Sequence, residues 1–104
     1  MQILVNTNQS IDNDARLTEH VEEVVEKRLA HYASHITRVE VHLSDANADK
    51  SGDDDTRCMV EVRPTGRKPI AVTHFAGNVA DAVRGASDKM QRALEKELAK
   101  TGRR

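Results

Sequence analysis

Residues 37–44 read TRVEVHLS, and this stretch decides the fold because apolar and polar side chains alternate along it. Successive side chains of an extended chain point to opposite faces, so Val39, Val41 and Leu43 share one side. The polar residues between them occupy the other side. The pattern predicts a strand in a sheet that is buried on one face only.

The same alternation recurs in residues 56–63 and 68–74, which predicts two more strands. Their apolar positions also share one face: Cys58, Val60, Val62, Ile70 and Val72. The polar loop 45–55 joins the first pair of strands and the turn Pro64–Arg67 joins the second pair, which favours antiparallel neighbours. A short run rich in Ile and Val at residues 2–7 predicts the first strand of the chain.

Two other segments carry apolar residues at steps of three and four, which predicts amphipathic helices. The first spans about residues 14–34, with Asp12 or Asn13 as its cap, and the second spans about residues 76–100. The apolar stripes are Leu17, Val21, Val24, Val25, Leu29 and Tyr32 in the first helix, and Val79, Val83, Ala86, Met90, Leu94 and Leu98 in the second.

The element order is therefore β-α-β-β-β-α, an α+β fold in a single domain of residues 1–104. The first helix connects strands one and two as a crossover, so these strands should be parallel neighbours. Every element has one apolar side, which predicts a four-stranded mixed sheet with both helices packed on the same face. The opposite face should carry Arg38, Glu40, His42, Arg57, Met59, Glu61 and Arg63.

The composition indicates a globular intracellular protein. Apolar residues make up 38% of the chain and charged residues 32%, with a net charge of −1. Cys58 is the only cysteine, so an internal disulfide is excluded. The first residues lack a basic segment and a long apolar run, and no stretch reaches membrane-spanning length. We expect a cytoplasmic protein with no membrane partner.

Four cations in the second helix form the sharpest functional feature. Lys89, Arg92, Lys96 and Lys100 are spaced by three, four and four residues, which places them on one stripe. Such a row can neutralise phosphates along a nucleic-acid backbone. The alternative is a solvated helix face with local ion pairs. The chain has one Tyr, one Phe and no Trp, so it lacks a set of aromatic side chains on which bases could stack. We expect any nucleic acid to be recognised through its shape and its backbone phosphates.

The metal-binding patterns in the sequence are incomplete. The segment Asp45–Asp49 starts like an EF-hand loop, but Lys50 stands where the loop needs Gly and Thr56 where it needs Glu. His31 and His35 have a spacing that can hold a metal on a helix, but no further ligand accompanies them. We expect no metal and no other cofactor.

The sequence also lacks the parts of an enzyme. No glycine-rich phosphate loop and no Gly-x-Ser-x-Gly turn is present. Cys58 falls on an inward strand face, where a thiol serves as a small apolar residue. We therefore expect no catalysis and no small-molecule substrate.

Taken together, several segments resemble the ribosome hibernation-promoting factors, also described as ribosome-associated inhibitors or sigma-54 modulation proteins. The similar segments follow the family's order and spacing over nearly the whole chain: Met1–Asn6, the helix with Leu17 and Val21, Ile36–Leu43, Arg67–His74, Ala82-Val83 and Asp88–Leu94. The resemblance implies the same β-α-β-β-β-α fold, in the short form without the C-terminal dimerisation domain of longer members.

The resemblance also implies a function in the stress response. Family members bind the small ribosomal subunit between its head and body, block the tRNA and mRNA positions and silence idle ribosomes. Lys89, Arg92 and Lys96 match positions that face ribosomal RNA in the family, so the resemblance implies the same role for them. Lys27 and Arg28 on the first helix match RNA-facing positions less closely. The chain departs from the family in having Ala80 where an aromatic residue is frequent, and in acids that dilute the closing helix, Glu95 and Glu97.

Two hypotheses therefore follow from the sequence. The first is a protein that represses translation or stabilises idle ribosomes by binding ribosomal RNA. The second is a protein-interaction or stress module of the same fold that has little RNA affinity, since a fold can be retained while its function changes.

Overall fold

The computed structural model describes residues 1–8, 11, 14–45 and 55–101. Its elements follow the predicted order: β1 (Gln2–Thr7), α1 (Ala15–Leu29), a short 3₁₀ helix η1 (Ala30–His35), β2 (Ile36–Asp45), β3 (Thr56–Pro64), β4 (Ile70–Ala76) and α2 (Val79–Thr101). The predicted α+β class and β-α-β-β-β-α order are confirmed.

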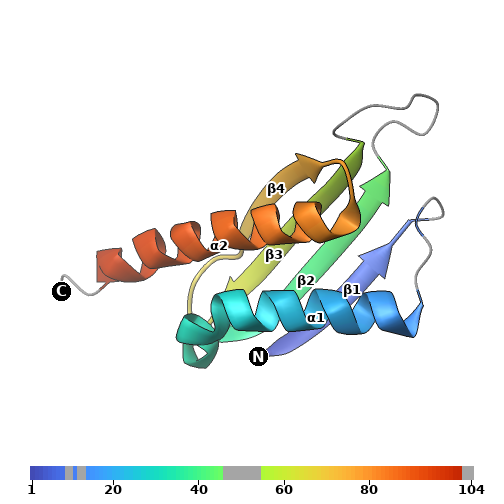
Figure 1. Ribbon diagram of the computed structural model, residues 1–104. Helices are drawn as coiled ribbons and strands as arrows, with labels where there is room; N and C mark the ends of the chain where they lie inside the picture. Colours follow the sequence, from blue (N-terminus) through green and yellow to red (C-terminus); the bar gives the residue numbers. More distant parts are fainter. Residues whose placement is uncertain (9–10, 12–13, 46–54, 102–104) are drawn as a thin grey trace.

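The strands form one mixed sheet in the order β1-β2-β3-β4. Strand β1 runs parallel to β2, with Val5 opposite Val41, whereas the β2–β3 and β3–β4 pairs are antiparallel. Both helices cover the same face of the sheet, and α2 packs over β3 and β4 (Figure 1). The predicted parallel crossover and the single helical layer are therefore both correct.

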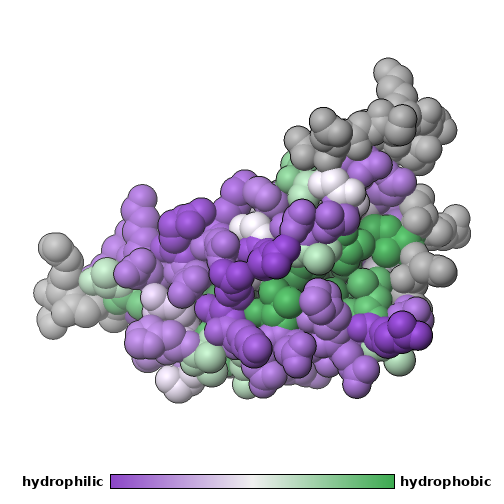
Figure 2. All heavy atoms as spheres, in the orientation of Figure 1, coloured by the Kyte–Doolittle hydropathy of each residue, from purple (hydrophilic) through white to green (hydrophobic). Residues whose placement is uncertain are grey.

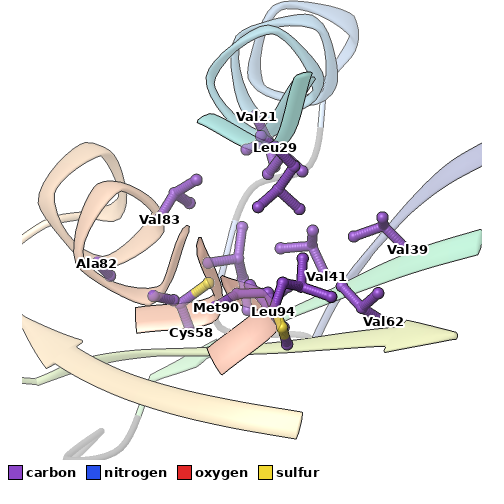
Figure 3. Close-up of a cluster of buried hydrophobic side chains, with 14 of the residues drawn as sticks. Val21, Leu29, Val39, Val41, Cys58, Val62, Ala82, Val83, Met90 and Leu94 are labelled. Carbon is purple, nitrogen blue, oxygen red and sulfur yellow. The ribbon is translucent and has the colours of Figure 1, made fainter. Parts of the chain in front are cut away.

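The core lies between this sheet face and the two helices, as Figure 3 shows. The inward strand residues named from the alternation are almost completely buried: Val39, Val41, Leu43, Cys58, Val60 and Val62. They meet buried side chains of both helices: Val21, Val25, Leu29, Val83, Ala86, Met90 and Leu94. Burying one such aliphatic side chain contributes about 1.5–3 kcal/mol, so this layer is the main source of stability. Ala82 and Ser87 are also fully buried, although they lie outside the predicted stripe.

Helix α1 differs from the prediction at both ends. Its cap is Asp14, whose Oδ1 accepts a hydrogen bond of 2.9 Å from the Leu17 N–H, in place of the predicted Asp12 or Asn13, which lie outside the described residues. The α-helix ends at Leu29 and not near Ser34, because the chain tightens into η1 before it enters β2. Tightening of a last turn into 3₁₀ geometry satisfies terminal carbonyls that an α-helix leaves unpaired.

Helix α2 begins at Val79 and not at Ala76, because Asn78 caps it. The Asn78 Oδ1 accepts a hydrogen bond of 2.8 Å from the Asp81 N–H. Hydrogen bonds from Arg84, and then from Asn78, hold the pKa of the Asp81 carboxyl below its usual value. Strand β4 correspondingly extends to Ala76, which places this strand two residues later than predicted.

The turn before β4 lies at the predicted residues, Pro64–Arg67. The Arg67 N–H donates to the Pro64 carbonyl at 3.3 Å, which closes a four-residue turn. Gly66 has a φ of 71°, the left-handed conformation that the third residue of a type II turn requires. Residues 67–69 then lead into β4 beneath the C-terminal half of α2 (Figure 1).

Candidate RNA-binding surface

The open face of the sheet carries both acids and bases, and one ion pair joins two of them. On β2 the Arg38 guanidinium donates to the Glu40 carboxylate, and this hydrogen bond holds the pKa of Glu40 below its usual value. His42 Nε2 lies 3.4 Å from the other Glu40 oxygen. Most of the predicted polar positions here are half-buried, and Arg63 is the exposed one. Three arginines, Arg38, Arg57 and Arg63, stand here against the two glutamates Glu40 and Glu61, so this face has a net charge of +1 when His42 is left aside.

The predicted stripe on α2 is a single exposed row. Lys89, Arg92, Lys96 and Lys100 are all exposed. The Lys89 Nζ donates a hydrogen bond of 2.9 Å to the Thr73 carbonyl of β4, so this side of α2 overhangs the edge strand of the sheet. At about 100° per residue, Lys96 and Lys100 lie within about 20° of Lys89 around the helix axis, and Arg92 within about 60°. The row is about 16 Å long at 1.5 Å per residue.

The two cations predicted on α1 are not part of this row. Arg28 forms an ion pair of 2.6 Å with Asp88 of α2, and both side chains are more than one-third exposed. Asp88 therefore turns toward α1 while the next residue, Lys89, turns toward β4. Lys27 is exposed on α1, on the far side of α2 from Lys89. The structure separates Lys27 and Arg28 from the α2 stripe.

The outer side of α1 is acidic. Glu19, Glu23 and Glu26 are exposed along it, and Lys27 lies one turn after Glu23. Figure 2 shows hydrophilic side chains over the outward sides of both helices, with hydrophobic ones reaching the surface between them. The exposed row of four cations thus lies on the β4 side of α2, away from these acids.

Two of the acids near the stripe are already paired with cations. Asp88 is held by Arg28, as described above, and Glu97 is held by Arg67 from the turn before β4. The Arg67 Nη1 donates to the Glu97 main-chain carbonyl at 3.0 Å and to its carboxylate at 3.3 Å. These pairs reduce the opposing charge near Lys89 and Lys96. The sequence prediction missed Arg67, since no local pattern relates residues thirty positions apart.

The other candidate chemical groups have ordinary surroundings. His31 and His35 are exposed in η1, and the His31 ring makes an edge contact with Tyr32 at 5.0 Å between centroids. Among residues 1–8, 11, 14–45 and 55–101, no three His, Cys, Asp or Glu side chains are placed to hold a metal. Most of the loop that begins like an EF-hand, residues 46–54, lies outside the described residues.

Cys58 is buried as predicted, and burial raises the pKa of its thiol to about 12. A buried thiol with so high a pKa stays protonated at neutral pH, as expected of a small apolar core residue. In the described part of the chain, no helix has the length and apolar content to cross a membrane.

Solved structures with this fold include two bacterial proteins. The chain superposes on the N-terminal domain of protein Y from Thermus thermophilus with a TM-score of 0.73, at 18% identity, covering 92% of this chain and 98% of that one. It superposes on a ribosomal subunit interface protein from Coxiella burnetii with a TM-score of 0.71, at 19% identity, covering 95% and 99%. At these identities the likeness shows a shared fold. Comparison with curated proteins finds no match.

The family assignment comes from the sequence. Residues 5–101 match the family described as Sigma 54 modulation protein / S30EA ribosomal protein. The match runs from β1 through α2 and so includes every element of the fold. It confirms the resemblance seen in the sequence segments. The chain belongs to the Sigma 54 modulation protein / S30EA ribosomal protein family.

Proposed function

We propose that this protein binds the small ribosomal subunit through its ribosomal RNA and represses translation, or stabilises idle ribosomes, under stress. It acts by occupying space and not by catalysis, and its place of action is the cytoplasm. Family membership supports the association with ribosomes. The observation that carries the RNA contact is the exposed row of Lys89, Arg92, Lys96 and Lys100 on one side of the molecule.

The proposed contact is electrostatic. Each Lys or Arg that neutralises a phosphate releases condensed counterions, and this release drives binding with little dependence on base identity. Tyr32 lies in η1, and Phe75 is exposed on β4, the strand that Lys89 contacts, so at most one aromatic side chain could stack with a base near the stripe. The protein would recognise the shape and phosphate pattern of folded RNA.

The side opposite the stripe helps to orient the complex. The acids Glu19, Glu23 and Glu26 on α1 repel phosphate, and the open sheet face has a net charge of only +1, against four cations on the α2 stripe. The β4 side of α2 is therefore the side that would lie against RNA. Lys27 would add a peripheral contact, whereas Arg28 contributes less because Asp88 already compensates its charge.

Sedimentation of the protein with ribosomes tests this function. The wild type should travel with small subunits through a sucrose gradient and inhibit translation in a reconstituted system. The double variant Lys89→Glu/Arg92→Glu should stay folded, because both side chains are exposed, and should remain at the top of the gradient. Arg63→Glu is the control, since it reverses one positive charge on the open sheet face, which is half the charge change of the double variant.

Two results would oppose the proposal. A wild-type protein that never enters the subunit fractions would remove the ribosomal function. Loss of binding in Arg63→Glu, with binding retained in Lys89→Glu/Arg92→Glu, would transfer the contact to the sheet face and favour the protein-interaction module.

A further inference from the structure

A surface hollow lies where the turn before β4 meets the last turns of α2. It has a volume of about 660 Å³ and is lined by Gly66, Arg67, Lys68, Pro69, Ile70 and Glu97. All but Glu97 come from a single continuous segment. Because this segment joins two strands, its position is fixed at both ends by the sheet. The hollow is therefore built on a rigid support.

The hollow adjoins the distal end of the α2 stripe. Lys100 Nζ lies 3.8 Å from the Glu97 Oε1, and Lys96 directly precedes Glu97 in the chain. Lys68 is exposed on the opposite wall. Two cations without a role in the core thus lie near Glu97: Lys68 lines the same hollow, and Lys100 reaches the Glu97 carboxylate from α2.

The charge of the hollow is positive. The lining residues Arg67 and Lys68 contribute two positive charges, and Glu97 contributes one negative charge that Arg67 pairs at 3.3 Å. Lys100 does not line the hollow, but its Nζ lies 3.8 Å from the Glu97 Oε1 and adds a third positive charge beside it. The Arg67 side chain is only 18% exposed and its guanidinium contacts the Glu97 carboxylate, so little of it is accessible to a ligand. Lys68 and Lys100 remain as the exposed cations, and a phosphate between them would be the matching ligand.

We propose that this hollow is a second contact for the RNA backbone, in which Lys68 and Lys100 bind a phosphate and extend the α2 stripe onto the turn before β4. The inference rests on the proposed function and deepens it. It adds Lys68, which the helical spacing does not include, to the RNA-binding residues. Both walls of the hollow would then touch the same strand of RNA.

Arg67 serves as a positioning residue for this site. The buried side chains of α2 end at Leu94, so the turns that carry Lys96 and Lys100 have few core contacts. The two hydrogen bonds from Arg67 to Glu97 tie these turns to the sheet. Arg67→Ala should increase amide hydrogen exchange at residues 95–100 in the free protein, and Arg67→Lys should restore part of the protection. Exchange unchanged by Arg67→Ala would overturn this role.

The phosphate site itself is tested without ribosomes. Inorganic phosphate is titrated into the ¹⁵N-labelled protein at constant ionic strength, with chloride as the balancing anion. Saturating amide shifts at Gly66, Lys68 and Glu97 are expected in the wild type and in Arg63→Glu, and their loss is expected in Lys68→Glu. Absence of saturating shifts at this turn, or equal shifts in Lys68→Glu, would overturn the site.

Binding to isolated small subunits then tests the RNA contact. Lys68→Glu should weaken binding and make the slope of log K against log salt shallower by about 1, with Arg63→Glu unchanged. Lys68→Glu that binds as the wild type does would overturn the extension of the stripe. If the wild type fails to bind subunits, the proposed function is lost, and the phosphate titration still decides whether the hollow is an anion site.

Discussion

Replacing Gly85 with alanine sets two effects of known size against each other. Gly85 lies in the middle of α2, where alanine is favoured over glycine by about 1 kcal/mol. However, a methyl group at this position would collide with the ring of His74, because that imidazole packs against the backbone of the helix. His74 lies opposite Cys58 in the β3–β4 register, on the sheet face that the helices cover.

The steric effect should win. Overpacking a filled site costs about 1–3 kcal/mol, because side chains leave their rotamers or backbone elements separate. Three ring atoms of His74 lie within the clash, so the whole imidazole has to move. After the gain in helix propensity is subtracted, we expect Gly85→Ala to destabilise the protein by about 0–2 kcal/mol. In a His74→Ala background the clash is absent, and Gly85→Ala should instead stabilise by about 1 kcal/mol.

A double-mutant cycle measured by urea denaturation gives the coupling directly. The four proteins are the wild type, the two single variants and the double variant, and the coupling energy should be about 1–3 kcal/mol. Gln91→Ala at an exposed position of α2 is a control for helix propensity alone. If Gly85→Ala stabilises the wild type by the same amount as the His74→Ala background, the packing of His74 on α2 is wrong.

Three further predictions concern stability and reactivity. Cys58 should resist a thiol reagent at neutral pH until urea unfolds the protein, because burial raises its pKa from 9.0 to about 12, and rapid labelling of the native protein would contradict this. Because the thiol ionises at lower pH in the unfolded protein than in the native one, the free energy of unfolding should fall as the pH rises from 9 toward 12. Asp14→Ala removes the cap of α1 and should lower the free energy of unfolding by about 1 kcal/mol, whereas an unchanged urea midpoint would show that the Leu17 N–H has another partner. A chelator should leave the melting temperature unchanged, because Lys50 and Thr56 occupy the positions that calcium coordination needs; a clear fall would reveal a bound metal.

The fold could be predicted from the sequence because each element has a single apolar side. The alternation around Val39, Val41 and Leu43 leaves one choice of inward face, and the two helical stripes must cover that face. Element ends were less predictable, since Asp12, Asn13 and Asp14 are chemically equivalent as caps. Each of these side chains has an oxygen that can accept the capping hydrogen bond, so the local sequence does not choose among them.

The charged surface could be predicted only where it depends on spacing within one element. The α2 stripe follows from spacing within one helix, so its four cations could be named in advance. The pairs Arg28–Asp88 and Arg67–Glu97 join residues far apart in the chain, and only the folded structure brings them together. The first pair directs Arg28 toward Asp88 and away from the stripe. The second joins Glu97 to the turn that carries Lys68, where both residues line the hollow.

The salt dependence of binding to isolated small subunits tests the central claim most directly. Four phosphate contacts from the α2 stripe predict a slope of log K against log salt of about −3, or about 60-fold weaker binding at 200 mM than at 50 mM salt. The slope should become shallower by about 2 in Lys89→Glu/Arg92→Glu and stay unchanged in Arg63→Glu. A slope near zero in the wild type, or one that the double variant leaves unaltered, would contradict an RNA contact through this stripe.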